Sequence, residues 1–236
     1  MTVQAFFKAA PMSAVLIVSF VAYFAWQFAL GVDIDNPSAY DLLSFGANYL
    51  LLTVTIEPYR LFTSGFLHIG LMHLLFNSFA LYYFGRVAEP LVGSKKLLCV
   101  FLASVLAGNL LNLWHGFLSM QIGLSAGASG GIMGIGALLT VLSLSPRYPF
   151  LSSKNLLVVM AINLLLGFAV PGIDNAGHIG GAVMGAVLGG LLLCLTAFFW
   201  WGVGLIIVLL GGVYYLLYIQ VHACLMVADC ATRLTL

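Results

Sequence analysis

The sequence contains a succession of apolar runs, most of them long enough to cross a lipid bilayer as a helix. They cover about residues 11–31, 66–86, 97–116, 129–145, 155–170, 177–198 and 203–221. A spanning helix needs about 20 mainly apolar residues, because the hydrocarbon core offers no water to backbone N–H and C=O groups. Of the 236 residues, 63% are hydrophobic and only 6% are charged. This composition predicts an all-α fold, a polytopic transmembrane helical bundle.

We expect residues 1–198 to form a six-helix core and residues 199–236 to add a seventh span and a short tail. The tail carries one Asp and one Arg, which cancel. The charge pattern therefore leaves open whether six spans place the C-terminus inside or seven place it outside.

The charges of the loops predict the orientation of the core. Lys8 and the loops at 86–96 and 147–154 carry most of the basic residues, whereas the 33–60 loop is mainly acidic. By the positive-inside rule, the N-terminus lies in the cytoplasm. The loops at 32–65, 117–128 and 171–177 then lie outside. The first of these loops contains apolar pieces, 42–45 and 49–56, which are too short to span and are expected at the interface. Short cytoplasmic parts and the lack of an organellar transit signal favour a bacterial inner membrane.

Several classes of function are excluded by composition and motifs. The net charge is +1 with no basic run, so nucleic acid is not an expected partner. The four cysteines are scattered without CxxC or Cys/His spacing, which predicts neither a disulfide framework nor a zinc site. No His-Glu-x-x-His or Walker sequence occurs. We therefore expect no metal or organic cofactor.

Polar residues inside the spans are candidates for a functional site, because unpaired polar groups are costly in hydrocarbon. Ser129 lies in a run of small residues that includes Gly127 and Gly130. At about 1.5 Å per residue, it sits roughly 24 Å above the cytoplasmic end of its span. His73 sits about 20 Å above the inner face by the same estimate, and His178 begins the sixth span from outside. All three are therefore expected in the outer half of the bilayer.

Glycines predict which spans approach each other. Glycine recurs every fourth residue from Gly177 to Gly189, and small residues at this spacing allow close helix packing. The fourth span offers a similar pair, so we expect it to pack on the sixth and to bring Ser129 beside His178. Histidine is the usual base that activates a serine. His73 and Asn77 share one helix face and are expected to donate hydrogen bonds to an oxyanion.

Together these residues resemble the rhomboid family of intramembrane serine proteases over about residues 10–198. The matching motifs are Tyr59-Arg60, His68, His73-Leu-Leu-Phe-Asn77, Gly85 with Glu89, Gly127-Ala-Ser129-Gly130 and Ala176-Gly-His178-Ile-Gly-Gly181. The resemblance implies a six-helix bundle with a Ser129–His178 dyad in a wet cavity open to the outside. It also implies that His73 and Asn77 serve the oxyanion hole. His68 is then a structural or water-retaining residue, and Glu89 ties the second span to its neighbours.

Two positions depart from the pattern of many relatives. Tyr59 precedes Arg60 where tryptophan is frequent, and Met133 stands where a tyrosine often stacks on the catalytic histidine. A thioether packs less rigidly against an imidazole. Asp174 lies four residues before His178, but we interpret it as a helix cap or a solvated turn.

The predicted function is cleavage of transmembrane protein substrates near the outer membrane face by a serine endopeptidase. Two alternatives remain open. One is a catalytically silent rhomboid-like protein that binds membrane clients, and the other is a small-solute transporter. The other polar residues of the spans (Asn109, Asn112, His115 and Asn163) are expected to be structural.

Overall fold

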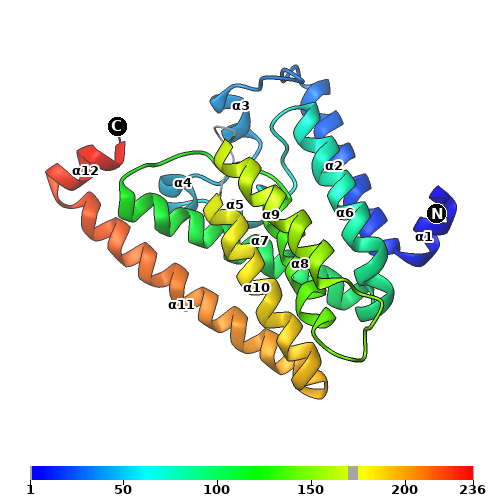
Figure 1. The fold of residues 1–236 in the computed structure, drawn as a ribbon. Coiled ribbons are helices and arrows are strands. Elements are labelled where there is room, and N and C mark those ends of the chain that lie inside the picture. The colour runs from blue at the N-terminus through cyan, green and yellow to red at the C-terminus, as the bar shows by residue number, and fades with distance from the viewer. Residues whose placement is uncertain (1, 170–174, 236) are drawn as a thin grey trace.

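A computed structural model describes residues 2–169 and 175–235, and the chain folds into helices joined by short connections (Figure 1). No β-strand longer than an isolated bridge occurs in these residues. The longer helices are α2 (Pro11–Ala29), α6 (Leu71–Val92), α7 (Ser94–Ser119), α8 (Ser129–Ser143), α9 (Ser153–Ala169), α10 (Asn175–Cys194) and α11 (Phe199–Leu225). The shorter ones are α1 (Val3–Ala9), α3 (Ala39–Ser44), α4 (Leu50–Thr55), α5 (Arg60–Thr63), the 3-10 turn η1 (Thr196–Phe198) and α12 (Ala228–Thr235). The predicted all-α membrane fold is confirmed.

Four of the described helical segments are long and apolar enough to cross a membrane: α2, α7, α10 and Thr196–Leu225. The apolar helices α8 and Ser153–Leu165 are shorter. Helix α6 begins at Leu71 rather than at the predicted residue 66. Gly70 before it has a φ of +84°, and the Leu71 amide donates instead to the carbonyl of Ile34 at 2.9 Å. A positive φ is open to glycine at little cost, so Gly70 ends the preceding loop.

Helices α7, α8 and α10 form the centre of the bundle, and α10 packs most extensively on α8 and α7. The packing of α8 on α10 agrees with the glycine pattern. A Cβ atom built on Gly181 would meet the carbonyl oxygen of Gly130, and one on Gly185 would meet that of Gly134. Glycine therefore allows the two backbones to touch directly.

The loop between α2 and α6 folds into the short helices α3, α4 and α5 and is fixed by a buried arginine. Arg60 Nη1 donates to the carbonyls of Leu43 at 2.8 Å and Ala47 at 2.9 Å, and the guanidinium pairs with Glu57. Only 5% of Arg60 is exposed. One side chain thus ties the end of α3 to the start of α5.

Helix α11 runs along the outer side of α7, and its C-terminal half packs against α4 (Figure 1). The Tyr214 hydroxyl donates to the carbonyls of Thr53 and Val54 at 3.2 and 3.1 Å. Cys224 and Cys230 form a disulfide between the end of α11 and α12. The expectation that no cysteines pair is therefore wrong for these two. Their spacing of six residues matches no common motif, and a turn between two helices brings them together.

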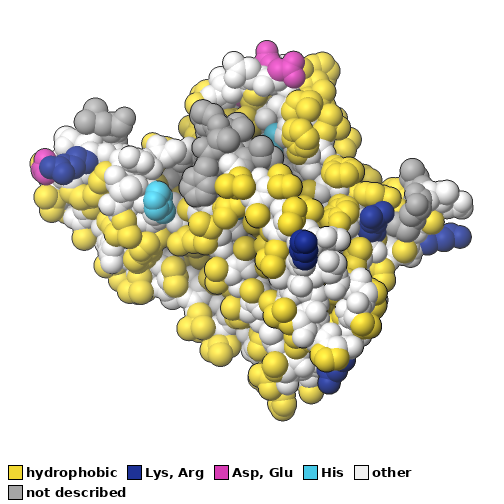
Figure 2. Space-filling model, in the orientation of Figure 1, with side chains coloured by type: hydrophobic (Ala, Val, Ile, Leu, Met, Phe, Trp, Pro, Cys, Tyr) yellow, Lys and Arg dark blue, Asp and Glu magenta, His cyan; other side chains and the backbone are white. Residues whose placement is uncertain are grey.

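The visible surface is mainly hydrophobic, with few charged groups (Figure 2). Acidic groups appear above α3 and beside α12, whereas most basic groups lie between the centre and the right-hand side of this face. Large exposed apolar side chains on α11 include Trp201, Val208 and Leu209. Such a surface suits lipid rather than water.

Candidate active site

Ser129 is the first residue of α8. The irregular segment before it, residues 123–128, forms hydrogen bonds at two positions with the loop between α2 and α6, which we call the first loop. Asn48 and Ser125 exchange backbone hydrogen bonds of 2.8 and 2.9 Å in an isolated antiparallel bridge. The amide of Gly127 donates to the carbonyl of Ser64 at 2.8 Å. Gly127 has a φ of +130°, a backbone conformation that disfavours other residues. This turn directs the chain into α8 with Ser129 at its start.

His178 lies in the first turn of α10, beside the start of α8. Its Nε2 atom is 2.7 Å from Ser129 Oγ, which is a normal hydrogen-bond distance. Gly177, next to it, approaches both Gly108 of α7 and Gly130 of α8. His178 is 5% exposed. Close packing of three helices thus places an imidazole against a serine hydroxyl in a largely buried site.

His73 contributes a second imidazole from the start of α6. The Ile69 amide donates to His73 Nδ1 at 3.2 Å, so the proton of a neutral ring is assigned to Nε2. That edge of the ring faces Gly127, where an added Cβ would come within 2.6 Å of Cε1 and 2.8 Å of Nε2. An N–H donor is thereby directed toward the segment that carries Ser129.

Asn77 lies one helical turn after His73 and is 5% exposed. One of its amide hydrogens reaches the carbonyl of His73 at 3.0 Å, and an amide group has two hydrogens to donate. His68 is fully buried, and its Nδ1 lies 3.1 Å from the carbonyl of Phe66. The His68 ring stands 5.3 Å from the His73 ring. Of these residues, His73 is the one whose ring lies beside the serine segment, at Gly127, and Asn77 follows it on the same helix.

Glu89 and Arg60 connect other parts of the described chain. The Glu89 carboxylate accepts the amides of Met12 and Ser13 at 2.7 and 2.8 Å, and the hydroxyls of Ser13 and Ser94 at 2.7 and 2.6 Å. It joins the end of α6 to the starts of α2 and α7. Arg60 organises the first loop, as described above.

Met133 is buried one turn after Ser129, and Asp174 lies outside the described residues. Within residues 2–169 and 175–235, no three His, Cys, Asp or Glu side chains form a metal-binding group. Asn48, Ser64 and Asn109 support the serine segment, a link that the sequence alone does not indicate for Asn48 or Ser64. Asn109 is expected to be structural, and its amide binds Leu61 and Ser64 of the first loop.

Comparisons with known proteins agree with this architecture. The family model of the Rhomboid domain matches residues 55–196. Rhomboid protease GluP of Bacillus subtilis is 41% identical over 161 residues, which are 67% of this chain and 31% of that protein. Rhomboid protease AarA of Providencia stuartii is 30% identical over 196 residues, 73% of this chain and 69% of that protein.

A plant relative, RHOMBOID-like protein 6, mitochondrial, of Arabidopsis thaliana, is 34% identical over 165 residues, 67% of this chain and 52% of that protein. The aligned part of the chain thus spans about a third of GluP and about half of the plant protein. The matched domain covers more than half of the chain and contains the serine segment together with His73 and His178. The chain belongs to the rhomboid family.

Proposed function

We propose that the protein is an intramembrane serine endopeptidase with Ser129 as nucleophile and His178 as general base. The observation that carries this proposal is the 2.7 Å distance between Ser129 Oγ and His178 Nε2. A serine hydroxyl is a weak nucleophile until a base removes its proton, and this distance permits the transfer directly. The named rhomboid proteases among the relatives support the same reaction class.

In the proposed reaction, Ser129 Oγ attacks the carbonyl carbon of the scissile peptide bond while His178 Nε2 accepts the hydroxyl proton. The tetrahedral intermediate collapses, the C–N bond breaks, and the imidazolium passes the proton to the leaving amine. Water, deprotonated by His178, then attacks the acyl ester. The bond between the acyl carbon and Ser129 Oγ breaks, the imidazolium returns the proton to Oγ, and the carboxylic acid product leaves. These steps use only Ser129, His178 and water, and they need no cofactor.

We assign the stabilisation of the oxyanion to His73, Asn77 and the backbone amide of Ser129. The Ser129 amide belongs to the first turn of α8, whose N–H groups have no partner within the helix. The positive end of the helix dipole favours negative charge there. With Nε2 carrying the proton, His73 offers a further N–H donor beside Gly127. Several donors aimed at one point are the usual source of oxyanion stabilisation.

The proposed substrates are transmembrane proteins that are cut near the outer membrane face. Their cleaved segment has to be extended, because a helix hides its backbone carbonyls in internal hydrogen bonds. We place the catalytic core in residues 1–198, with α11 as a seventh span and the C-terminus outside. The predicted setting is a bacterial inner membrane, with the N-terminus in the cytoplasm and the site open to the external side.

The deciding experiment incubates purified protein with a panel of model transmembrane substrates and compares wild type with Ser129→Ala and His178→Ala. We expect cleavage by the wild type only, with equal expression of all three proteins. A fluorophosphonate probe should label Ser129 and spare the His178→Ala variant.

Client binding without cleavage would favour a silent rhomboid-like protein. Solute flux in liposomes that is unchanged in Ser129→Ala would favour a transporter. Residual turnover in Ser129→Ala would refute the assignment of the nucleophile.

A further inference from the structure

The segment that leads to Ser129 is held between two parts of the first loop. Its Ser125 pairs with Asn48 through two backbone hydrogen bonds, and its Gly127 amide reaches the Ser64 carbonyl. Asn48 precedes α4 and Ser64 ends α5, so 16 positions separate the two supports along the chain. The position of the serine segment therefore depends on how these supports are fixed to each other and to the bundle.

Asn109 of α7 contacts both supports. Its Nδ2 atom donates to Ser64 Oγ at 2.9 Å and to the Leu61 carbonyl at 2.8 Å. The Asn48 Nδ2 atom lies 3.3 Å from the Asn109 backbone carbonyl and 3.4 Å from its Oδ1. The side chain of Asn109 in the central helix α7 thus connects the two loop positions, Asn48 and Ser64, that hydrogen-bond to the serine segment.

This group of polar residues is deeply buried. Asn48 and Thr53 are fully buried, Ser64 is 1% exposed, and Asn109 is 8% exposed. The Thr53 hydroxyl donates to Asn48 Oδ1 at 3.0 Å, and Tyr214 of α11 binds the backbone of Thr53. Buried polar networks have defined geometry, because a lost partner leaves a group that water cannot satisfy.

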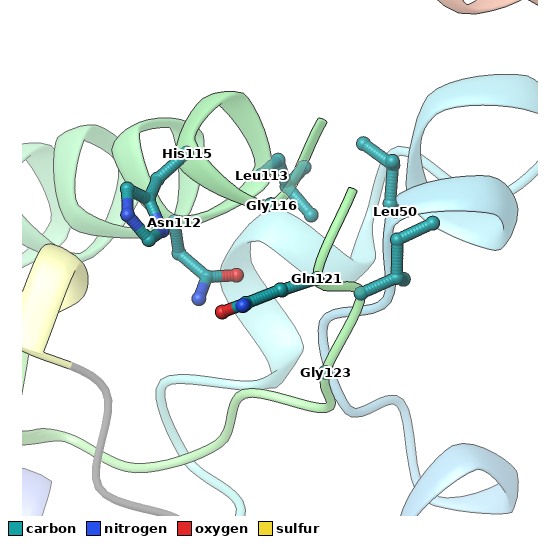
Figure 3. A pocket seen from close by; sticks show the side chains of 8 residues that line it. Leu50, Asn112, Leu113, His115, Gly116, Gln121 and Gly123 are labelled. Atoms are coloured by element: carbon teal, nitrogen blue, oxygen red, sulfur yellow. The ribbon is translucent and has the colours of Figure 1, made fainter. Parts of the chain in front are cut away.

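The outer edge of the group is different. Asn112, one turn further along α7, lies 3.4 Å from Asn48 Nδ2 and also lines an open pocket together with Leu50, His115 and Gln121 (Figure 3). In this view the Asn112 amide extends toward the Gln121 side chain. This pocket has room for water, which can replace a lost hydrogen bond. The position of the serine segment therefore depends on the inner residue of this group, Asn109.

We infer that Asn109 is a positioning residue for the serine protease reaction, acting through Ser64 and Asn48 on the backbone of residues 125–127. This inference rests on the proposed function. Because Gly127 also contacts the His73 ring, a shift of this segment changes the position of Ser129 and of an oxyanion donor together. A displacement of about 1 Å at reacting groups can cost about 100-fold in rate.

The test measures kcat and KM for a model transmembrane substrate with Asn109→Leu and with the milder Ser64→Ala, which retains the backbone carbonyl that Gly127 uses. We expect kcat to fall about tenfold or more in Asn109→Leu, with KM changed by less than about threefold. The double variant with Ser64→Ala and Asn109→Leu should have a kcat only slightly lower than that of Asn109→Leu alone. Both substitutions break the same connection between Asn109 and Ser64. All assays are run well below the unfolding temperature of each variant.

The matched control is Asn163→Leu in α9. Asn163 is also a polar residue of an apolar helix, but its amide donates to the carbonyl of Val159 in the same helix at 2.9 Å. We expect wild-type kcat from this variant. If Asn163→Leu loses as much activity as Asn109→Leu, the effect is a general response to polar substitutions in the bundle and the inference is overturned.

Hydrogen exchange at residues 123–130 gives a readout that does not require activity. Asn109→Leu should accelerate exchange of the Ser125 and Gly127 amides, whereas Asn163→Leu should not. Unchanged exchange together with unchanged kcat in Asn109→Leu refutes the positioning role while cleavage by the wild type upholds the proposed function. A wild-type protein that neither cleaves nor reacts with a fluorophosphonate overturns the proposed function, and the inference falls with it.

Discussion

Ser129 Oγ and His178 Nε2 lie 2.7 Å apart, although 49 positions separate the two residues along the chain. Each sits in the first turn of its helix, and the glycines that follow on α10 allow that helix to touch the backbone of α8. The distance between hydroxyl and imidazole therefore depends on how closely the two helices pack. The expected consequences of this and of other contacts can be measured.

Gly181→Ala should push α10 away from α8, because the new methyl group meets the carbonyl oxygen of Gly130. We expect kcat to fall about 100-fold and the free energy of unfolding to fall by about 1–3 kcal/mol. Cleavage assays and thermal unfolding in detergent measure both effects. Gly190→Ala on the same helix is the control, since no atom lies within 4 Å of its added Cβ. Equal activity in the two variants would contradict the role of close packing.

Gly127→Ala should impair the reaction through His73. The alanine has to adopt a φ of +130°, and its Cβ overlaps the His73 imidazole. Removing a donor from an oxyanion site costs about 100-fold or more in kcat, so we expect a loss of that order. Gly123→Ala lies in the same segment with nothing within 4 Å and should retain wild-type kcat. A normal rate in Gly127→Ala would show that His73 can move without effect.

Glu89→Gln should destabilise the protein more than it changes chemistry. The carboxylate accepts four hydrogen bonds from Met12, Ser13 and Ser94, and an amide NH₂ cannot accept those directed at its nitrogen. Losing one partner of such a buried group costs about 3 kcal/mol. Ser94→Ala removes only one donor and should cost about 1 kcal/mol. Denaturation in mixed micelles compares the two, and a smaller loss in Glu89→Gln than in Ser94→Ala would contradict this account.

Cysteine labelling should reveal the side of the membrane at which α11 ends. With seven spans, the Cys224–Cys230 disulfide lies outside, and the exposed thiol of Cys194 lies at the cytoplasmic end of α10. In intact cells, a membrane-impermeant maleimide should label Cys224 and Cys230 only after mild reduction. Cys194 should react only after the cells are opened. Single Cys→Ser variants identify each labelled position. Labelling of Cys194 in intact cells would exclude the proposed orientation.

The helices were predictable because the bilayer requires long apolar runs, and such runs leave a clear signal in the sequence. The positions where helices begin were less predictable. The apolar run that begins at residue 66 continues into α6 and is interrupted before that helix only by His68, so the positive φ of Gly70 is what shows where the loop ends. Of the two apolar pieces that were expected at the interface, 42–45 overlaps the end of α3, and 49–56 contains all of α4.

The side chains gathered around the serine were predicted mainly from their chemical types and family motifs, with the glycine spacing showing which helices meet. The residues that support the serine segment carry no motif or spacing that would predict their role. Asn48 and Ser64 are ordinary loop residues in the sequence, and their importance arises from tertiary contacts to Ser125, Gly127 and Asn109. The pairing of Cys224 with Cys230 also depends on the turn between α11 and α12. Long-range pairing of this kind leaves no periodic pattern.

Glycine has no functional group, yet Gly181 and Gly185 occupy places where any side chain would enter a neighbouring backbone. Along the contact between α8 and α10, almost no glycine can consequently be replaced without separating the two helices. Tolerated substitutions are instead expected among the side chains that face lipid. Random mutagenesis should return functional variants with few or no changes along this line of contact.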